Sequence, residues 1–166
     1  MTAVGLEMVM PADEPIIEYR RFFAASPQLV FQAFTDPEHL RHWRGPEELQ
    51  MVSCEIDLRV GGRYRYVYRG PEGQHHVFHG EYREVQPPNR LVSTFVYEAA
   101  SEDQAVETVI FDEVDGGTMV TSRSILPSLK ARDLYVATGA ERGLMESGRR
   151  LDQLLNSLIG IGHVAR

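Results

Sequence analysis

The sequence has little of what several large protein classes require. Its 166 residues include a single cysteine, Cys54, so no disulfide can form within the chain, and we expect a reducing compartment, the cytoplasm. The formal net charge of −7 argues against nucleic acid as a partner, because phosphate binding needs a basic surface. There is no apolar run of about 18 residues, so we expect no membrane span. The first residues also lack the basic start of a secretory signal.

The usual signatures of enzyme chemistry are missing as well. The sequence contains no G-x-S-x-G motif, no P-loop and no dinucleotide-binding fingerprint. Cys54 falls on the apolar face of its expected strand, where a buried inert thiol and a reactive thiol are both open interpretations. We therefore predict no catalytic residues and no cofactor.

Residues 26–46 carry the clearest structural signal, which is two short helices in direct succession. Ser26 and Asp36 can each accept a hydrogen bond at a helix start, and each is followed by a proline at a position where the missing N–H costs nothing. Apolar residues recur at helical spacing between them, and Gly45 with Pro46 ends the unit.

Strand-like segments lie on both sides of this helical unit. Period-two alternation, bounded by turns rich in glycine and proline, predicts about seven strands joined mostly by short turns. Such a succession is typical of an antiparallel sheet. The predicted strands are 16–24, 50–58, 63–69, 75–85, 91–97, 107–113 and 118–126.

About 30 helical residues are predicted after Pro127, and one face of this helix changes character along its length. The first half of the face is small, with Gly139, Gly143 and Ser147, and Gly148 lies beside it. Interior glycine costs a helix about 1 kcal/mol relative to alanine, so these glycines need a reason. Close approach of the helix to the sheet and an unfilled volume between them are both open.

The second half of this helix ends in a markedly apolar stretch. It permits three interpretations: an ordinary core contact, docking of the N-terminal segment, or the contact of a homodimer. The residues concerned are Leu154, Leu155, Leu158, Ile159 and Ile161.

Charged residues within the strands allow two interpretations. Cross-strand ion pairs on the outer face are one, at about 0.2–1 kcal/mol each. The other is that one charge, Arg123 or Glu81 for example, points inward and marks the polar end of a ligand. Alternation in 118–126 does not decide which face of that strand is buried.

The histidines fall in two groups. His39 and His42 are three residues apart on the second short helix, and His75, His76 and His79 surround one hairpin. A helical pair with a strand histidine could hold zinc, but no Cys or Glu recurs at metal-ligand spacing. We therefore expect solvated histidines and no metal site.

Several segments together carry a family resemblance. They are V-F-Q-A-F-T-D-P-E-H-L-R-H-W at 30–43, the Gly61-Gly62 turn, H-G-E-Y-R-E-V-Q-P-P-N-R-L-V at 79–92, D-G-G-T at 115–118 and A-R-D-L-Y-V-A-T-G-A-E-R-G-L-M-E-S-G-R-R-L at 131–151. In this order they resemble the START-like (SRPBCC) superfamily, and within it the AHSA1-like branch, named for homologues of an activator of the heat-shock-protein-90 ATPase. Many members are bacterial proteins of unknown function.

The resemblance implies an α+β helix-grip fold, in which a curved antiparallel sheet wraps a long C-terminal helix. It also implies a hydrophobic cavity between sheet and helix. The members of the superfamily share no common set of catalytic residues, so the resemblance implies no active site. We expect one domain over 15–160, a flexible N-terminal tail over 1–14 and a C-terminal tail over 161–166. From position and strand parity, the candidate cavity lining is Trp43, Tyr64, Tyr66, Phe78, Tyr82, Phe95, Tyr97, Val109, Phe111, Gly143 and Leu144.

Three functions remain open at this point. The leading one is binding of a small hydrophobic or amphipathic ligand, since aromatic walls with a few hydroxyls suit such a molecule. The second is a co-chaperone-like module that contacts a chaperone partner and stimulates its ATPase. The third is a cyclase-like or hydratase-like enzyme that works through Tyr and His side chains in the same cavity.

Overall fold

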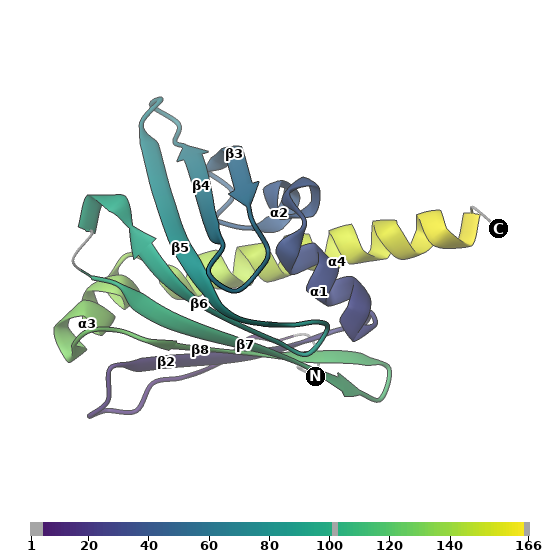
Figure 1. Cartoon of the computed structure of the whole chain (residues 1–166), viewed down its shortest axis with the longest axis horizontal. Helices are drawn as coiled ribbons and strands as arrows, with labels where there is room; N and C mark the ends of the chain where they lie inside the picture. The colour runs from purple at the N-terminus through teal and green to yellow at the C-terminus, as the bar shows by residue number, and fades with distance from the viewer. Residues whose placement is uncertain (1–4, 101–102, 165–166) are drawn as a thin grey trace.

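The computed structural model describes residues 5–100 and 103–164, which form a curved antiparallel sheet and four α-helices. The order of the eight strands in the sheet is β1-β2-β8-β7-β6-β5-β4-β3. Figure 1 shows α1, α2 and α4 on the same side of the sheet, with the end of α4 extending past it. This is the α+β helix-grip architecture that the sequence predicts.

The element bounds agree well with the predicted segments. The strands are β1 (Glu7–Val9), β2 (Ile16–Phe23), β3 (Gln50–Ile56), β4 (Arg63–Arg69), β5 (His75–Gln86), β6 (Arg90–Tyr97), β7 (Ala105–Val114) and β8 (Gly117–Ile125). The helices are α1 (Pro27–Thr35), α2 (Pro37–Trp43), α3 (Leu129–Ala137) and α4 (Ala140–Val164), with a short 3₁₀ turn η1 (Glu98–Ala100).

Three boundaries differ from the prediction. Within the expected N-terminal tail, β1 pairs with the outer edge of β2, so the sheet has one strand more than the seven expected. The helix α4 continues to Val164, through the first part of the segment 161–166 that was expected to be a C-terminal tail. The single long helix is divided at Gly139, whose φ of +88° is readily adopted by glycine but strained for other residues.

The two short helices form as their caps predict. Ser26 accepts a hydrogen bond from the Leu29 amide at 3.3 Å, and Asp36 accepts one from the Glu38 amide at 2.9 Å. Asp36 is both the last cap of α1 and the first cap of α2, so the chain turns sharply without an unsatisfied helix end. The turn brings the apolar faces of both helices onto the sheet.

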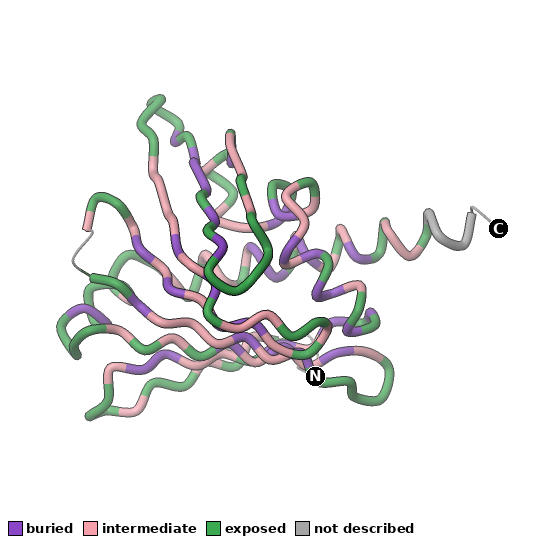
Figure 2. Tube along the Cα trace, in the orientation of Figure 1, coloured by how far each residue is buried: buried purple, intermediate pink, exposed green. Residues whose placement is uncertain are grey.

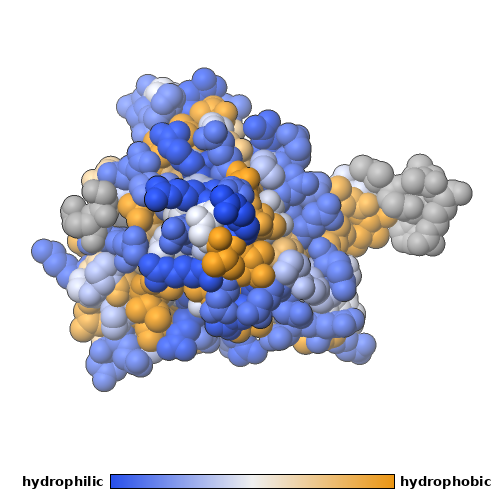
Figure 3. Space-filling view, viewed as in Figure 1, coloured by the Kyte–Doolittle hydropathy of each residue, from blue (hydrophilic) through white to orange (hydrophobic). Residues whose placement is uncertain are grey.

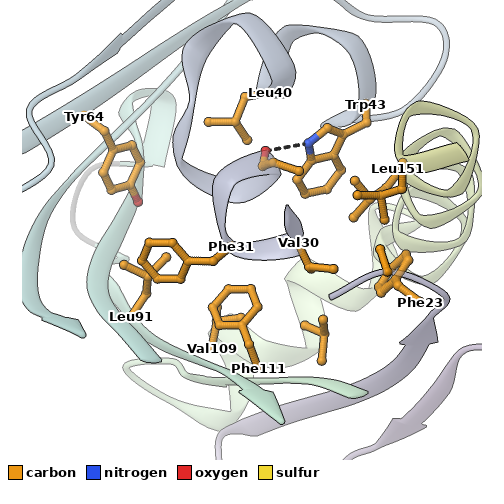
Figure 4. Packing of buried hydrophobic residues seen from close by; sticks show 14 of the residues in the cluster. Phe23, Val30, Phe31, Leu40, Trp43, Tyr64, Leu91, Val109, Phe111 and Leu151 are labelled. Atoms are coloured by element: carbon orange, nitrogen blue, oxygen red, sulfur yellow. Dashed lines mark hydrogen bonds between the residues drawn. The ribbon is translucent and has the colours of Figure 1, made fainter. Parts of the chain in front are cut away.

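The helices α1 and α2 fill one end of the space above the sheet. Phe31 and Phe34 of α1 pack edge-on against Phe111 of β7, with ring centroids 5.3 and 5.1 Å apart. The Trp43 ring lies 4.8 Å from Phe34, and its indole N–H donates to the Ala33 carbonyl at 2.9 Å (Figure 4). Figure 2 shows buried residues concentrated in these helices and in the strands they cover. This end of the molecule is solid core.

Strand register settles which side chains face the helices. Thr118, Val120 and Ser122 of β8 are at most 1% exposed, whereas Arg123 is exposed on the outer face. Glu81 of β5 is paired in register with Arg63, also on the outer face. Neither Arg123 nor Glu81 therefore provides the inward charge that was considered from the sequence.

Candidate functional site

Six of the nominated residues come together on the inner face of β4, β5 and β6. The Tyr64 ring lies 4.9 Å from the Tyr66 ring and 5.4 Å from the Tyr82 ring. Beside them, the Phe78 ring stacks on two rings of β6, Phe95 at 5.4 Å and Tyr97 at 4.9 Å. We call these six residues the aromatic wall.

Gly80 explains how Tyr64 lies flat in this wall. A Cβ at Gly80 would sit 1.9 Å from the Thr94 carbonyl oxygen and 2.5 Å from the Tyr64 hydroxyl. Because that Cβ is missing, Tyr64 crosses the neighbouring strand and donates its hydroxyl proton to the Thr94 carbonyl. The glycine in the motif at 79–92 is therefore needed for the close approach of a side chain.

The other nominated residues lie elsewhere. Trp43, Val109 and Phe111 are 5%, 5% and 0% exposed and belong to the packed core under α1 and α2 (Figure 4). Gly143 and Leu144 lie in the first turns of α4 and are partly exposed. Tyr64, Tyr66 and Tyr82 of the aromatic wall are 4%, 5% and 4% exposed and belong to the same buried cluster, and Phe78 and Phe95 pack against it. The aromatic wall is therefore continuous with the core, and Gly143 and Leu144 lie apart from both on α4.

The glycines at the start of α4 each have a different role. Gly139 ends the preceding helix with its positive φ. Gly148 lets Arg21 approach, because a Cβ there would lie 2.9 Å from Arg21 Nε. Gly143 is on the same face as the buried residues Ser147 and Leu151, yet a Cβ there would meet no atom within 4 Å. Close approach, one of the two reasons left open by the sequence, therefore applies at Gly148, and the space around the Cβ position of Gly143 is free.

Polar groups that were not nominated also face the helices. By register, Tyr19 of β2 and Ser122 of β8 are opposite each other, and Glu107 of β7 is on the same face of the sheet as Ser122. The Ser122 hydroxyl donates to a Glu107 carboxylate oxygen at 3.3 Å. Arg44, just after α2, places its guanidinium carbon 5.4 Å from the centre of the Tyr66 ring. We call Tyr19, Arg44, Glu107 and Ser122 the inner polar group.

Burial shifts the pKa values of several of these side chains. Burial raises the pKa of Tyr19, with a further contribution from the charge of Glu107. Burial also raises the pKa of Tyr64, Tyr66 and Tyr82. Nevertheless Tyr19, Arg44 and Glu107 each retain some accessible surface. These three side chains are therefore neither fully buried nor fully exposed.

Arg21 is a second inward arginine, and its charge is fully matched. It donates to the Gly148 carbonyl and to an Asp152 carboxylate oxygen, both at 2.8 Å. Its guanidinium also lies 4.8 Å from the centre of the Phe23 ring. Arg21 therefore acts as a tie between β2 and α4.

The loop between α2 and β3 is fastened to α4. The Ser147 hydroxyl accepts from the Gly45 amide at 2.9 Å and donates to the Gly45 carbonyl at 3.0 Å. Arg150 donates to the same carbonyl at 2.9 Å. Further along, Glu48 pairs with Arg142 at 2.8 Å. These contacts fix the backbone next to Arg44.

The histidines and Cys54 offer little chemistry. The described residues include no cluster of three or more His, Cys, Asp or Glu side chains arranged to hold a metal ion. His76 shares a hydrogen bond of 2.9 Å with the Tyr97 hydroxyl, and His79 pairs with Glu98. Burial raises the pKa of the Cys54 thiol to about 11, so the thiol is protonated at neutral pH. This protonated state favours the interpretation of Cys54 as an inert thiol.

A separate cleft of about 220 Å³ lies between the end of β2 and α4. It is lined by Phe22, Ala24, Asp152, Leu155 and Asn156 and opens to solvent. Its one charged side chain, Asp152, is already paired with Arg21. This outer cleft has no aromatic wall.

The apolar end of α4 contributes to the core. Leu155 is 2% exposed, and Leu154 and Ile159 pack against the same cluster, which favours the core interpretation for this stretch. Ile161 lies outside the residues whose side chains are described. On the face seen in Figure 3, hydrophobic residues form separate patches among hydrophilic ones, one of them on α4 where it leaves the sheet. Within the part of the chain described, no helix is long and apolar enough to cross a bilayer.

The curved sheet, the α1–α2 pair and the long final helix define the class as a helix-grip α+β protein. Residues 24–156 match the family model described as activator of Hsp90 ATPase homolog 1-like protein, and the chain belongs to this family. No curated protein matches the chain significantly.

Solved structures of similar proteins share the architecture. A protein from Rhodobacter sphaeroides is 28% identical with a TM-score of 0.85, and the match covers 92% of this chain and 99% of that one. A protein from Nitrosomonas europaea is 25% identical with a TM-score of 0.79, covering 91% and 99%. The AHSA1-like protein from Aeromonas hydrophila is 21% identical with a TM-score of 0.69, covering 84% and 93%, and supports the fold alone.

Proposed function

We propose that this protein binds a small amphipathic molecule between the inner face of the sheet and the first half of α4. The observation that carries the proposal is Gly143, which lies on the face of α4 that also bears the buried residues Ser147 and Leu151 and has no atom within 4 Å of where its Cβ would be. The aromatic wall supplies apolar surface for such a ligand, and the inner polar group supplies hydrogen-bonding partners. Apolar ligands with a few polar atoms are bound in this way.

Burial would supply most of the affinity. At about 25 cal/mol per Å² of apolar surface, a few hundred Å² of ligand surface gives several kcal/mol before the cost of ordering the ligand. The protein would act in the cytoplasm, in agreement with its single cysteine.

A second candidate function is catalysis at the same place. It is favoured by the contact of the Ser122 hydroxyl with Glu107, next to Tyr19, because a carboxylate with neighbouring hydroxyls can transfer protons. Stimulation of a chaperone ATPase, which the family description suggests, has less support, since hydrophobic residues on the face seen in Figure 3 do not merge into one docking patch.

Native mass spectrometry of protein purified from its own host tests ligand binding directly. We expect a retained small molecule that is released on unfolding. If incubation with the folded protein converts that molecule into another compound, the catalytic function replaces simple binding.

Gly143→Leu is the variant that tests whether the ligand binds beside the first half of α4. Its side chain would enter the open space, so we expect the retained molecule to be lost while the fold survives. Gly160→Leu is the matched control, because Gly160 lies on the same helix, is exposed and also has no atom within 4 Å of its Cβ position. Retention of the ligand by Gly143→Leu would exclude this site.

A further inference from the structure

Arg44 and Arg21 are both directed toward the inside of the grip, but they differ in their partners. Arg21 has Asp152 at 2.8 Å. For Arg44, no carboxylate among the described residues lies within 4.0 Å of the guanidinium, although Glu107 is close enough to act on it electrostatically. A charge withdrawn from water without a counter-ion is costly, and is normally compensated by a partner.

The surroundings of Arg44 hold its side chain in place and favour its charged form. Burial opposes the charge, but Tyr66, Glu107 and the neighbouring tyrosines outweigh burial and raise the pKa of Arg44, although no carboxylate among the described residues touches the guanidinium. The Tyr66 ring lies beneath the guanidinium at 5.4 Å, and Tyr68 is next to it. The adjacent residue, Gly45, is fixed through its N–H and its carbonyl by Ser147. The arginine is therefore preorganised on an aromatic surface, with accessible area left for a further contact.

The position of Glu107 limits what the contact can be. It faces Arg44 from β7 across more than 4.0 Å and is already engaged by Ser122, so the two charges do not cancel by direct contact. A ligand that approaches Arg44 from the side of the aromatic wall can bind the guanidinium with a polar group. The apolar body of the same ligand then covers Tyr66 and its neighbours. A carboxylate matches the planar fork of arginine with two parallel hydrogen bonds.

We propose that the ligand is an amphipathic carboxylic acid whose carboxylate is bound by Arg44 and whose apolar body lies on the aromatic wall. This inference depends on the proposed binding function and adds the chemical class of the ligand. It makes Arg44 the residue that determines specificity for acids over neutral molecules of the same shape.

The test uses naphthalene-2-carboxylate and naphthalene-2-methanol as matched probes, with binding measured by isothermal titration calorimetry at neutral pH. We expect the wild-type protein to bind the carboxylate at least about tenfold more tightly than the alcohol. Arg44→Gln should remove this preference and leave the affinity for the alcohol within about twofold, which also shows that the variant is folded. Arg44→Lys should keep only part of the preference, because lysine keeps the charge but loses the fork.

Arg41→Gln is the control, since Arg41 lies on α2 three residues earlier and is exposed. It should leave both affinities unchanged. Equal affinity of the wild-type protein for both probes, or loss of both affinities together in Arg44→Gln, would overturn the assignment of Arg44 while ligand binding itself stands. If neither probe binds to the wild-type protein, the binding function and the inference both fail.

Discussion

Gly143→Ala is the substitution whose outcome depends most simply on the space beneath α4. Alanine in a helix interior is favoured over glycine by about 0.5–1 kcal/mol when its methyl group meets no obstacle. A Cβ at Gly143 has no atom within 4 Å. We therefore expect Gly143→Ala to raise the free energy of unfolding by about 0.5–1 kcal/mol.

Two other glycines provide comparisons in which the same change has the opposite sign. Gly148→Ala places its Cβ 2.9 Å from Arg21 Nε and would displace the hydrogen bonds of that guanidinium, a loss of about 1.5–3 kcal/mol that exceeds the helical gain. Gly139→Ala has free space but a φ of +88°, so we expect a loss of about 1 kcal/mol.

Equilibrium unfolding in urea, followed by far-ultraviolet circular dichroism, measures the free energy of unfolding of all three variants. The dependence of this free energy on urea concentration is expected to be the same for each variant. The signs of the three changes in the free energy of unfolding matter more than their absolute values. If Gly143→Ala is destabilised by more than about 0.5 kcal/mol, the methyl group meets packed atoms and the reasoning about open space is refuted.

Three further outcomes follow from the packing. Trp43→Phe removes the hydrogen bond to the Ala33 carbonyl together with ring volume, so urea unfolding should show a loss of about 2–3 kcal/mol, and a loss below 1 kcal/mol would contradict the packing described. Ser147→Ala should cost about 1–2 kcal/mol and speed amide exchange at Gly45, whereas unchanged exchange would mean that the loop is held otherwise. Burial raises the pKa of Tyr68 to about 12, so the folded state holds this proton where the unfolded chain releases it, and its share of the stability should be constant below pH 10 and fall by about 2–3 kcal/mol by pH 12. The other buried tyrosines add losses over the same range, so Tyr68→Phe should reduce the fall in the free energy of unfolding by about 2–3 kcal/mol, and an unchanged fall would contradict the burial of Tyr68.

Local signals in the sequence were sufficient for the helices and most strands. The cap-plus-proline pairs at Ser26 and Asp36 are decided by a few neighbouring residues, which is why their helices begin as predicted. The end of α3 carried a similar local signal, since Gly139 is a common residue just after a helix. The stripe of small residues continues through the break, and for this reason the sequence predicts one long helix in place of α3 and α4.

The candidate site was predictable only where alternation is strict. Tyr64 and Tyr66 alternate with arginines, so their inward direction follows from the sequence. The same parity that places Val109 and Phe111 inward also places Glu107 there, so the inward direction of Glu107 was equally predictable from the sequence. Arg44 follows a helix in an irregular loop, where no periodicity in the sequence indicates the direction of a side chain. The backbone of the next residue, Gly45, is held by hydrogen bonds with Ser147 and Arg150, about 100 residues later in the chain.

The most direct test of the binding site is to find where a bound probe lies. With isotope-labelled protein and unlabelled naphthalene-2-carboxylate, we predict intermolecular nuclear Overhauser effects from the naphthalene protons to the rings of Tyr64, Tyr66 and Tyr82. Effects confined to Phe22 and Leu155 of the outer cleft would contradict the account, because the inner face of the sheet would then be closed to ligands.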